Sequence, residues 1–231
     1  MRQPFHEQMI LPKSRTVLLL VDIQEEQRTD PDYHAAEFDR VLSNASKLLV
    51  AARSNGCNVA HAAYIRDFSI EPPRPFEATR PDGAPTFSDG AAGLTAICGE
   101  VAPTSNETVI TKNDASAFLG TGLKQLLADK SAEWLIICGV WTEAYIAATV
   151  RDAILHGFRV LLVKDACGSG SKAMHETAVL NLANRLYGGG ICDTERAVTL
   201  LRGGKADVWR VVDPVPLRFT QDNINQLYDE L

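Results

Sequence analysis

Two polar residues and one turn follow apolar runs, at points where an open parallel sheet would bind a ligand. Asp22 ends the run LLLVD, Lys112 ends TVITK, and residues 139–145 lead from a third apolar run into a helical pattern. Open parallel sheets bind ligands at the carboxyl ends of their strands, so these features are the first candidates for a site. Burial disfavours a charged Asp22 unless a cation lies close, and Lys112 can supply one, so that the pair would act as a tuned base. Position alone gives equal weight to the alternative that Asp22 caps a turn and Lys112 is a solvated strand end.

The segment GVWTEAYIAATVRDA directs the N–H groups of a first helical turn at whatever lies above the sheet. Such a turn suits an oxyanion, and it would favour the thiolate of a cysteine placed in it. The residue here is Tyr145, and an aromatic side chain in a first helical turn more often serves packing than chemistry. By position, the predicted pocket walls are Gln24, Phe118 and Trp141, although each also fits a core or turn position.

The elements that must hold these residues are predicted from the alternation of apolar runs and helical patterns. The apolar runs that we interpret as strands are 16–23, 58–65, 108–112, 133–140, 158–166 and 190–194. Helical spacing of apolar residues follows the first run, between 38 and 52, and the fifth, between 179 and 186; Thr142 is the expected cap of a helix that runs to Leu155. This order predicts one domain with three α/β/α layers and a doubly wound, mainly parallel, six-stranded sheet of the Rossmann-like kind.

Two segments interrupt the alternation. Residues 66–106 are rich in Pro, Gly, Asp and Ser, and a loop of that length within a domain is typical of a pocket wall or an interface lid. The tail from Gly203 to Leu231 continues beyond the last strand and helix pattern, and we expect it to pack on a neighbouring subunit or on the domain's own surface.

Composition limits the partners. The 231 residues carry a formal net charge of −6 and no basic run, which argues against nucleic acid and anionic membrane. No apolar stretch approaches the length of about 18 residues that a membrane span requires, and the first 15 residues lack a signal-peptide pattern. The five cysteines are odd in number and form no CxxC pair, as expected for reduced thiols. We expect a cytoplasmic protein that acts on a small molecule.

Four segments of the sequence resemble a known family. The strings VDIQ, TKNDASAFLGTGL and CGVWTEAYIAATVRDAILHGFRVLLVKDACGSG, followed by a GGG segment, are similar in order and spacing to the isochorismatase-like hydrolases. This family includes nicotinamidases, N-carbamoylsarcosine amidohydrolases, ureidoacrylate and biuret hydrolases, and the isochorismatases proper. The resemblance covers residues 14–202, which leaves an N-terminal arm at 1–13 and a C-terminal extension at 203–231. It also implies a homo-oligomer, a dimer or a tetramer.

The resemblance implies a catalytic triad of Asp, Lys and Cys at Asp22, Lys112 and position 145. In the family the aspartate takes the thiol proton, the lysine balances the carboxylate, and the thiolate attacks an amide or ureido carbonyl. Backbone N–H groups hold the oxyanion, here those of Ala144 and Tyr145, and a cis peptide bond precedes the turn, here between Val140 and Trp141.

Position 145 departs from the family pattern. A tyrosine hydroxyl has a reference pKa of about 10 and extends much further from the backbone than a cysteine sulfur, so it cannot take the same attacking position. The D-x-H pattern of the metal-binding members is also missing, because Asp67 is followed by Ser69 instead of a histidine. The resemblance therefore implies neither metal nor cofactor here.

Three functions remain open from the sequence. The first is a hydrolase of small amide, carbamoyl or ureido C–N bonds that Tyr145 has inactivated. The second is a cysteine-independent vinyl ether hydrolase that uses Asp22, although such enzymes carry a small residue where Tyr145 stands. The third is a non-catalytic binding or assembly protein.

Overall fold

A computed structural model describes residues 6–231, so residues 1–5 of the predicted arm lie outside the described residues. The strands are β1 (His6–Met9), β2 (Thr16–Val21), β3 (Asn58–Tyr64), β4 (Thr108–Lys112), β5 (Trp134–Val140), β6 (Arg159–Gly168), β7 (Gly190–Cys192) and β8 (Ala206–Trp209). The α-helices are α1 (Glu26–Thr29), α2 (Phe38–Ser54), α3 (Leu123–Asp129), α4 (Ala147–Leu155), α5 (Lys172–Ala183), α6 (Thr194–Leu201) and α7 (Ile224–Asp229). Short 3-10 turns span Lys13–Arg15 and Gly99–Val101, and a π-helical turn, η3, spans Thr142–Ile146.

The strands form one sheet in the order β1-β8-β7-β6-β5-β2-β3-β4. The six predicted strands are all present, and they are parallel to one another in the stretch from β7 to β4. The chain thus has the predicted α/β fold with a mainly parallel sheet in a single domain. The predicted number of six strands is wrong, because β8 pairs antiparallel with β7 and β1 pairs antiparallel with β8. Both missed strands have four residues, and β1 is mostly exposed, which removes the apolar signal of a buried strand.

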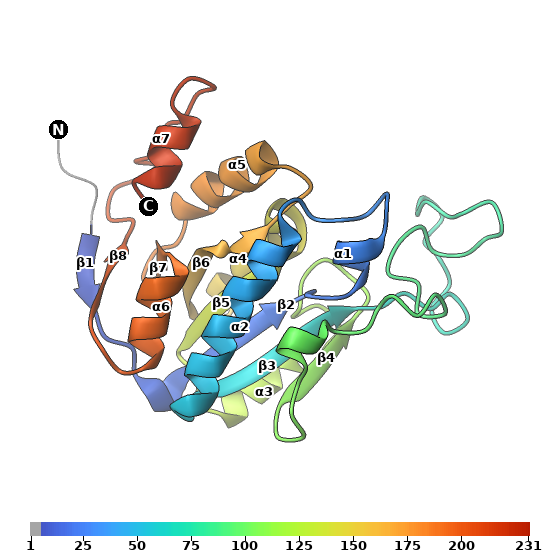
Figure 1. The fold of residues 1–231 in the computed structure, drawn as a ribbon, viewed down its shortest axis with the longest axis horizontal. Coiled ribbons are helices and arrows are strands. Elements are labelled where there is room, and N and C mark those ends of the chain that lie inside the picture. Colours follow the sequence, from blue (N-terminus) through green and yellow to red (C-terminus); the bar gives the residue numbers. More distant parts are fainter. Residues whose placement is uncertain (1–5) are drawn as a thin grey trace.

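Helices cover both faces of the sheet. Helices α2 and α6 lie side by side over the face that is nearer in Figure 1, and right-handed crossovers place α3 and α4 on the opposite face. All six residues of β2 and all seven of β5 are buried, as expected for the central strands of a sheet covered on both sides. These two adjacent strands carry Asp22 and the turn with Tyr145 at their carboxyl ends.

The end of β5 approaches β2 more closely than a side chain would allow. Gly139 has a φ of +130°, and a Cβ there would lie 1.9 Å from the carbonyl oxygen of Val21. Glycine is therefore required at this position, since any side chain would collide with the residue that precedes Asp22.

The segment between β3 and β4 projects beyond the edge of the sheet (Figure 1). Its outer part exposes Ile70 and Phe76 at 82% and 84%. Its inner part returns to the carboxyl ends of the strands through a bridge between Gln24 and Ile97. The C-terminal residues also pack on the domain itself, where Leu217 and Leu231 are buried. No helix within residues 6–231 is long and apolar enough to cross a membrane.

Candidate active site

Asp22 and Lys112 form a buried ion pair at the carboxyl ends of β2 and β4. Lys112 Nζ lies 2.7 Å from Asp22 Oδ2, and the two side chains are 0% and 2% exposed. Register explains the meeting, since β3 lies between the two strands and places Tyr64 beside Lys112. Asp22 has a φ of +54°, a left-handed conformation that aspartate tolerates better than most residues. The structure therefore excludes the alternative of a solvated strand end for Lys112.

Burial controls the charge of this pair. It raises the pKa of Asp22 to about 6, against the lowering effect of Lys112, and it lowers the pKa of Lys112. Neither carboxylate oxygen of Asp22 makes a well-formed hydrogen bond with the described part of the chain, so the ion pair is its main support. A carboxyl group with a pKa near neutrality can both accept and donate a proton.

We expect Asp22 to titrate near pH 6, because its charged form loses solvation on burial. The measurement is the ¹³C shift of its side-chain carboxyl between pH 4 and 8, with Asp22→Asn to assign the signal. A carboxyl that is already fully ionised over this pH range, as expected for a midpoint at or below the ordinary aspartate value of 3.8, would show that Lys112 fully offsets burial.

Tyr145 covers the ion pair with its ring. Lys112 Nζ lies 4.2 Å from the centroid of the Tyr145 ring and 4.4 Å from that of Tyr64, so the ammonium contacts two aromatic rings that also pack on each other, with centroids 5.2 Å apart. The Tyr145 hydroxyl lies 2.6 Å from that of Tyr33, and burial raises the pKa of Tyr145. The hydroxyl is therefore neutral and occupied by a hydrogen bond.

An aromatic stack extends from this contact. Tyr33 stacks on Trp141 at 5.1 Å on one side and on Phe87 at 4.7 Å on the other. Trp141 Nε1 donates to Gln27 Oε1 at 2.6 Å, and a Cβ at Gly170 would lie 2.6 Å from the Trp141 ring. Trp141 thus packs in the aromatic cluster beside the turn of residue 145, and its role as a pocket wall stays a prediction.

The turn that carries Tyr145 differs from the predicted helix start. Thr142 does not cap the helix, because its hydroxyl donates across the chain to the carbonyl of Gly168 at 2.8 Å, and the backbone winds as π-helix through Ile146. The bond between Val140 and Trp141 is cis, as the resemblance implies. The Ala144 N–H, one of the two predicted oxyanion donors, donates to the Trp141 carbonyl at 3.1 Å, so an oxyanion would compete with that bond.

Gln24 is fully buried and uses its amide on the backbone. Its Nε2 donates to the carbonyls of Tyr64 and Thr95 at 3.0 and 2.8 Å, and its Oε1 accepts from the Tyr64 N–H at 2.9 Å. Both donors of this amide and its oxygen are thus engaged by the backbone, so the predicted role in substrate binding is corrected to one of positioning. Gln24 holds the end of β3 against the returning loop.

Phe118 does not lie at the site. Its ring packs 5.3 Å from His156 and 6.0 Å from Phe158, which lie between the end of α4 and the start of β6. That position is at the amino-terminal edge of the sheet, opposite Asp22. The prediction of Phe118 as a pocket wall is therefore wrong, because the chain after β4 turns the ring toward the base of α4.

Other residues at the site were missed from the sequence. Glu26 is 3% exposed, and its carboxylate accepts from the N–H and the hydroxyl of Ser88 at 2.9 and 2.6 Å. Burial raises its pKa, and its charge in turn raises that of Asp22. Glu26 stands four residues after Asp22, a nearness in sequence that could have indicated it; Tyr33 and Phe87 lie in segments without any periodic signal.

The cysteine thiols do not replace the expected nucleophile. All five cysteines are buried and unpaired, and burial raises the pKa of Cys138 to about 12. No group of three or more His, Cys, Asp and Glu side chains within residues 6–231 is arranged to hold a metal ion. Asp67, at the family's metal position, accepts hydrogen bonds from the N–H and hydroxyl of Ser69 instead.

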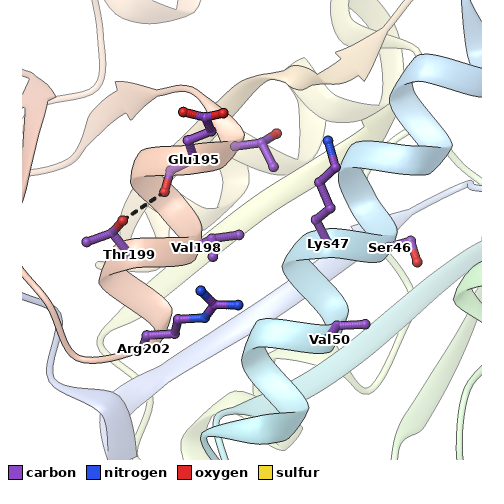
Figure 2. A pocket seen from close by; sticks show the side chains of 8 residues that line it. Ser46, Lys47, Val50, Glu195, Val198, Thr199 and Arg202 are labelled. Atoms are coloured by element: carbon purple, nitrogen blue, oxygen red, sulfur yellow. Dashed lines mark hydrogen bonds between the residues drawn. The ribbon is translucent and has the colours of Figure 1, made fainter.

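Two cavities differ in their relation to this site. One of 510 Å³ lies between α2 and α6, with Lys47 and Val50 on one wall and Val198 and Arg202 on the other (Figure 2). It includes no residue of the ion pair or the aromatic stack. A second cavity, of 260 Å³, is lined by residues that include Arg66, Glu71 and Lys112, but Asp22 does not line it and the Lys112 side chain is 0% exposed.

Comparisons with known proteins agree with this architecture. Residues 16–196 match the family model of the isochorismatase domain. A maleamate amidohydrolase from Pseudomonas putida is 30% identical over 183 residues, which cover 75% of this chain and 81% of the relative. An uncharacterized isochorismatase family protein from Bacillus subtilis is 29% identical over 164 residues, with 71% and 83% coverage.

Among solved structures, a cysteine hydrolase from Pseudomonas syringae pv. phaseolicola is similar with a TM-score of 0.74 at 20% identity. The likeness covers 87% of this chain and 98% of that one. At this identity the likeness concerns the fold.

Proposed function

Since the chain belongs to the isochorismatase family, we propose that it is a hydrolase by descent, built for the C–N bond of a small amide, carbamoyl or ureido compound, in which Tyr145 blocks the reaction. One similar protein is a maleamate amidohydrolase, which supports an amide as the ancestral substrate class. In this proposal Asp22 is the base, Lys112 holds its charge, and position 145 is the place of the nucleophile.

The observation that carries the proposal is the placement of Tyr145 over an otherwise complete pair. Its ring lies 4.2 Å from Lys112 Nζ, the cation that pairs with the proposed base Asp22. Amide cleavage through a covalent intermediate needs an activated nucleophile. The Tyr145 hydroxyl is instead hydrogen-bonded to Tyr33, and burial raises its pKa, so it supplies no anion at neutral pH.

The chain as it stands is expected to release no ammonia above background from carboxamides, carbamoyl compounds and ureides. The assay uses coupled detection of ammonia at pH 7.5, with protein purified through two different columns to exclude a contaminating amidase. Turnover that co-purifies with the chain and disappears in Asp22→Asn would contradict the proposal, because it would show that the site cleaves such bonds with a tyrosine at position 145.

A second candidate function rests on the pKa of Asp22 near 6. A carboxyl group that is partly protonated at neutral pH can donate a proton to a vinyl ether, which water then cleaves without a covalent intermediate. Hydrolysis of a vinyl ether such as isochorismate by the unaltered chain, lost in Asp22→Asn, would favour this candidate. Absence of both activities would favour a binding or assembly protein; a homo-oligomer remains part of our proposal in each case.

A further inference from the structure

The C-terminal extension reaches the turn that carries Tyr145. Helix α7 lies beyond residue 196, where the match to the family model ends. Its Tyr228 hydroxyl lies 3.0 Å from Nε2 of His175, and Nδ1 of the same ring lies 2.8 Å from the hydroxyl of Thr142, the first residue of η3. Three side chains thus connect α7 to the π-helical turn.

The Gly168 carbonyl at the end of this chain of hydrogen bonds fixes which group donates in each of them. Thr142 donates its hydroxyl proton to the carbonyl of Gly168, which can only accept. Thr142 must therefore accept from Nδ1–H of His175. A neutral imidazole then has Nε2 as its acceptor, so Tyr228 is the donor. The imidazole is neutral because burial lowers the pKa of His175 to about 4.

This chain of hydrogen bonds from Tyr228 through His175 to Thr142, called the relay below, is buried from His175 to Thr142 and fixed at both ends. Thr142 is 0% exposed and His175 is 5% exposed, so water does not replace these bonds readily. On the α7 side, Lys164 Nζ donates to the Tyr228 carbonyl at 2.7 Å and lies 4.6 Å from the centroid of its ring. On the turn side, Ser169 donates to Glu143, which ties the same turn to the segment after β6.

We propose that the hydroxyl of Tyr228 positions the turn of residue 145 through His175 and Thr142, so that the C-terminal helix sets the geometry of the site. Tyr228 and His175 are positioning residues, because neither is in contact with Asp22, Lys112 or Tyr145. This inference rests on the proposed function, which makes the turn of residue 145 part of the catalytic site. The hydrogen bonds from Tyr228 to Thr142 are tested without any substrate.

Tyr228→Phe removes the hydroxyl and keeps the ring that packs on Lys164. In the Tyr145→Cys chain, we expect this change to slow alkylation of the introduced thiol by iodoacetamide about fivefold at pH 7.5, as one lost buried hydrogen bond implies, and to raise the midpoint of the pH profile of that alkylation. Thr142→Val should reproduce the effect, and Thr142→Ser, which keeps the hydroxyl, should largely restore the rate. Tyr187→Phe is the matched control, because Tyr187 is 51% exposed.

A second readout uses the natural Tyr145 chain labelled with 5-fluorotryptophan. Tyr228→Phe should move the ¹⁹F signal of Trp141, which adjoins the turn, and leave that of Trp134, at the start of β5, in place. Unchanged alkylation together with an unchanged Trp141 signal would overturn the proposal. If Tyr145→Cys lacks amidase activity but Tyr228→Phe still alters both readouts, the proposed function fails and the relay stands.

Discussion

Replacing Tyr145 with cysteine is expected to produce ammonia release from small amides, carbamoyl compounds or ureides that the unaltered chain does not cleave. The new thiol would lie in the first turn after β5, where the end of a helix favours a thiolate. Asp22, with its pKa near 6, is suited to take the thiol proton. The smaller side chain also vacates the space that the ring holds beside Lys112.

The expected gain is large. Removal of the nucleophile from a covalent hydrolase costs on the order of 10⁶ in turnover, so restoring it should raise the rate at least about 10³-fold even with a poorly matched amide. The measurement is the rate of ammonia release by the two chains at equal concentration. A burst equal to the amount of enzyme, followed by slower turnover, would indicate an acyl-enzyme.

Two control variants separate the effect of the introduced thiol from that of the space that the Tyr145 ring vacates. Tyr145→Ala opens the same space without a thiol and should stay inactive, whereas Asp22→Asn in the Tyr145→Cys chain should abolish the gain. Equal rates for the alanine and cysteine chains would show that Tyr145 is only a steric block and that catalysis needs no covalent step. Inactivity of the cysteine chain on the whole panel would favour a binding role.

Replacing Lys112 with methionine is expected to lower the free energy of unfolding by about 3–5 kcal/mol at pH 7.5, since it leaves the carboxylate of Asp22 buried without its cation. Urea unfolding followed by circular dichroism measures the change. Lys124→Met is the matched control, because Lys124 is exposed and its loss should change stability by less than about 0.5 kcal/mol.

The sign of the pH dependence follows from the pKa of Asp22. In the natural chain this pKa already lies above its ordinary 3.8, and removing Lys112 raises it further. A carboxyl with a raised pKa in the folded state favours folding below its unfolded pKa, and this contribution is lost as the pH rises through the folded value. The Lys112→Met chain should therefore lose more stability at pH 8 than at pH 5.

Removing both charges tests the cause. The Asp22→Asn/Lys112→Met chain contains no uncompensated buried charge at this pair and should recover much of the stability that Lys112→Met loses. A double variant as unstable as the single one would mean that packing of the Lys112 side chain against Tyr64 and Tyr145, and not its charge, supports the fold.

The apolar runs determined most of the sheet in advance. Six strands were predicted because strands buried on both faces read as continuous apolar segments, whereas β1 and β8 are short strands at one edge without that signal. Their places at strand ends made Asp22 and Lys112 candidates, but position alone left a capping Asp22 and a solvated Lys112 equally open, and the family resemblance was needed to predict the pair that the structure shows. Trp141 was predicted as a wall from its place at the start of the turn after β5.

The sequence by itself therefore determined the properties that repeat along the chain. These are the six parallel strands and the edge of the sheet at which their polar carboxyl ends lie. Tertiary structure alone decided which side chains from aperiodic segments reach that edge. Tyr33 and Phe87 stack at the site, whereas the side-chain amide of Gln24 is hydrogen-bonded to the backbone. Phe118 packs at the opposite edge of the sheet. Tyr228 of the C-terminal extension is linked to Thr142 by hydrogen bonds through His175. These contacts join residues far apart in sequence, and the packing that selects them leaves no period in the sequence from which they could be predicted.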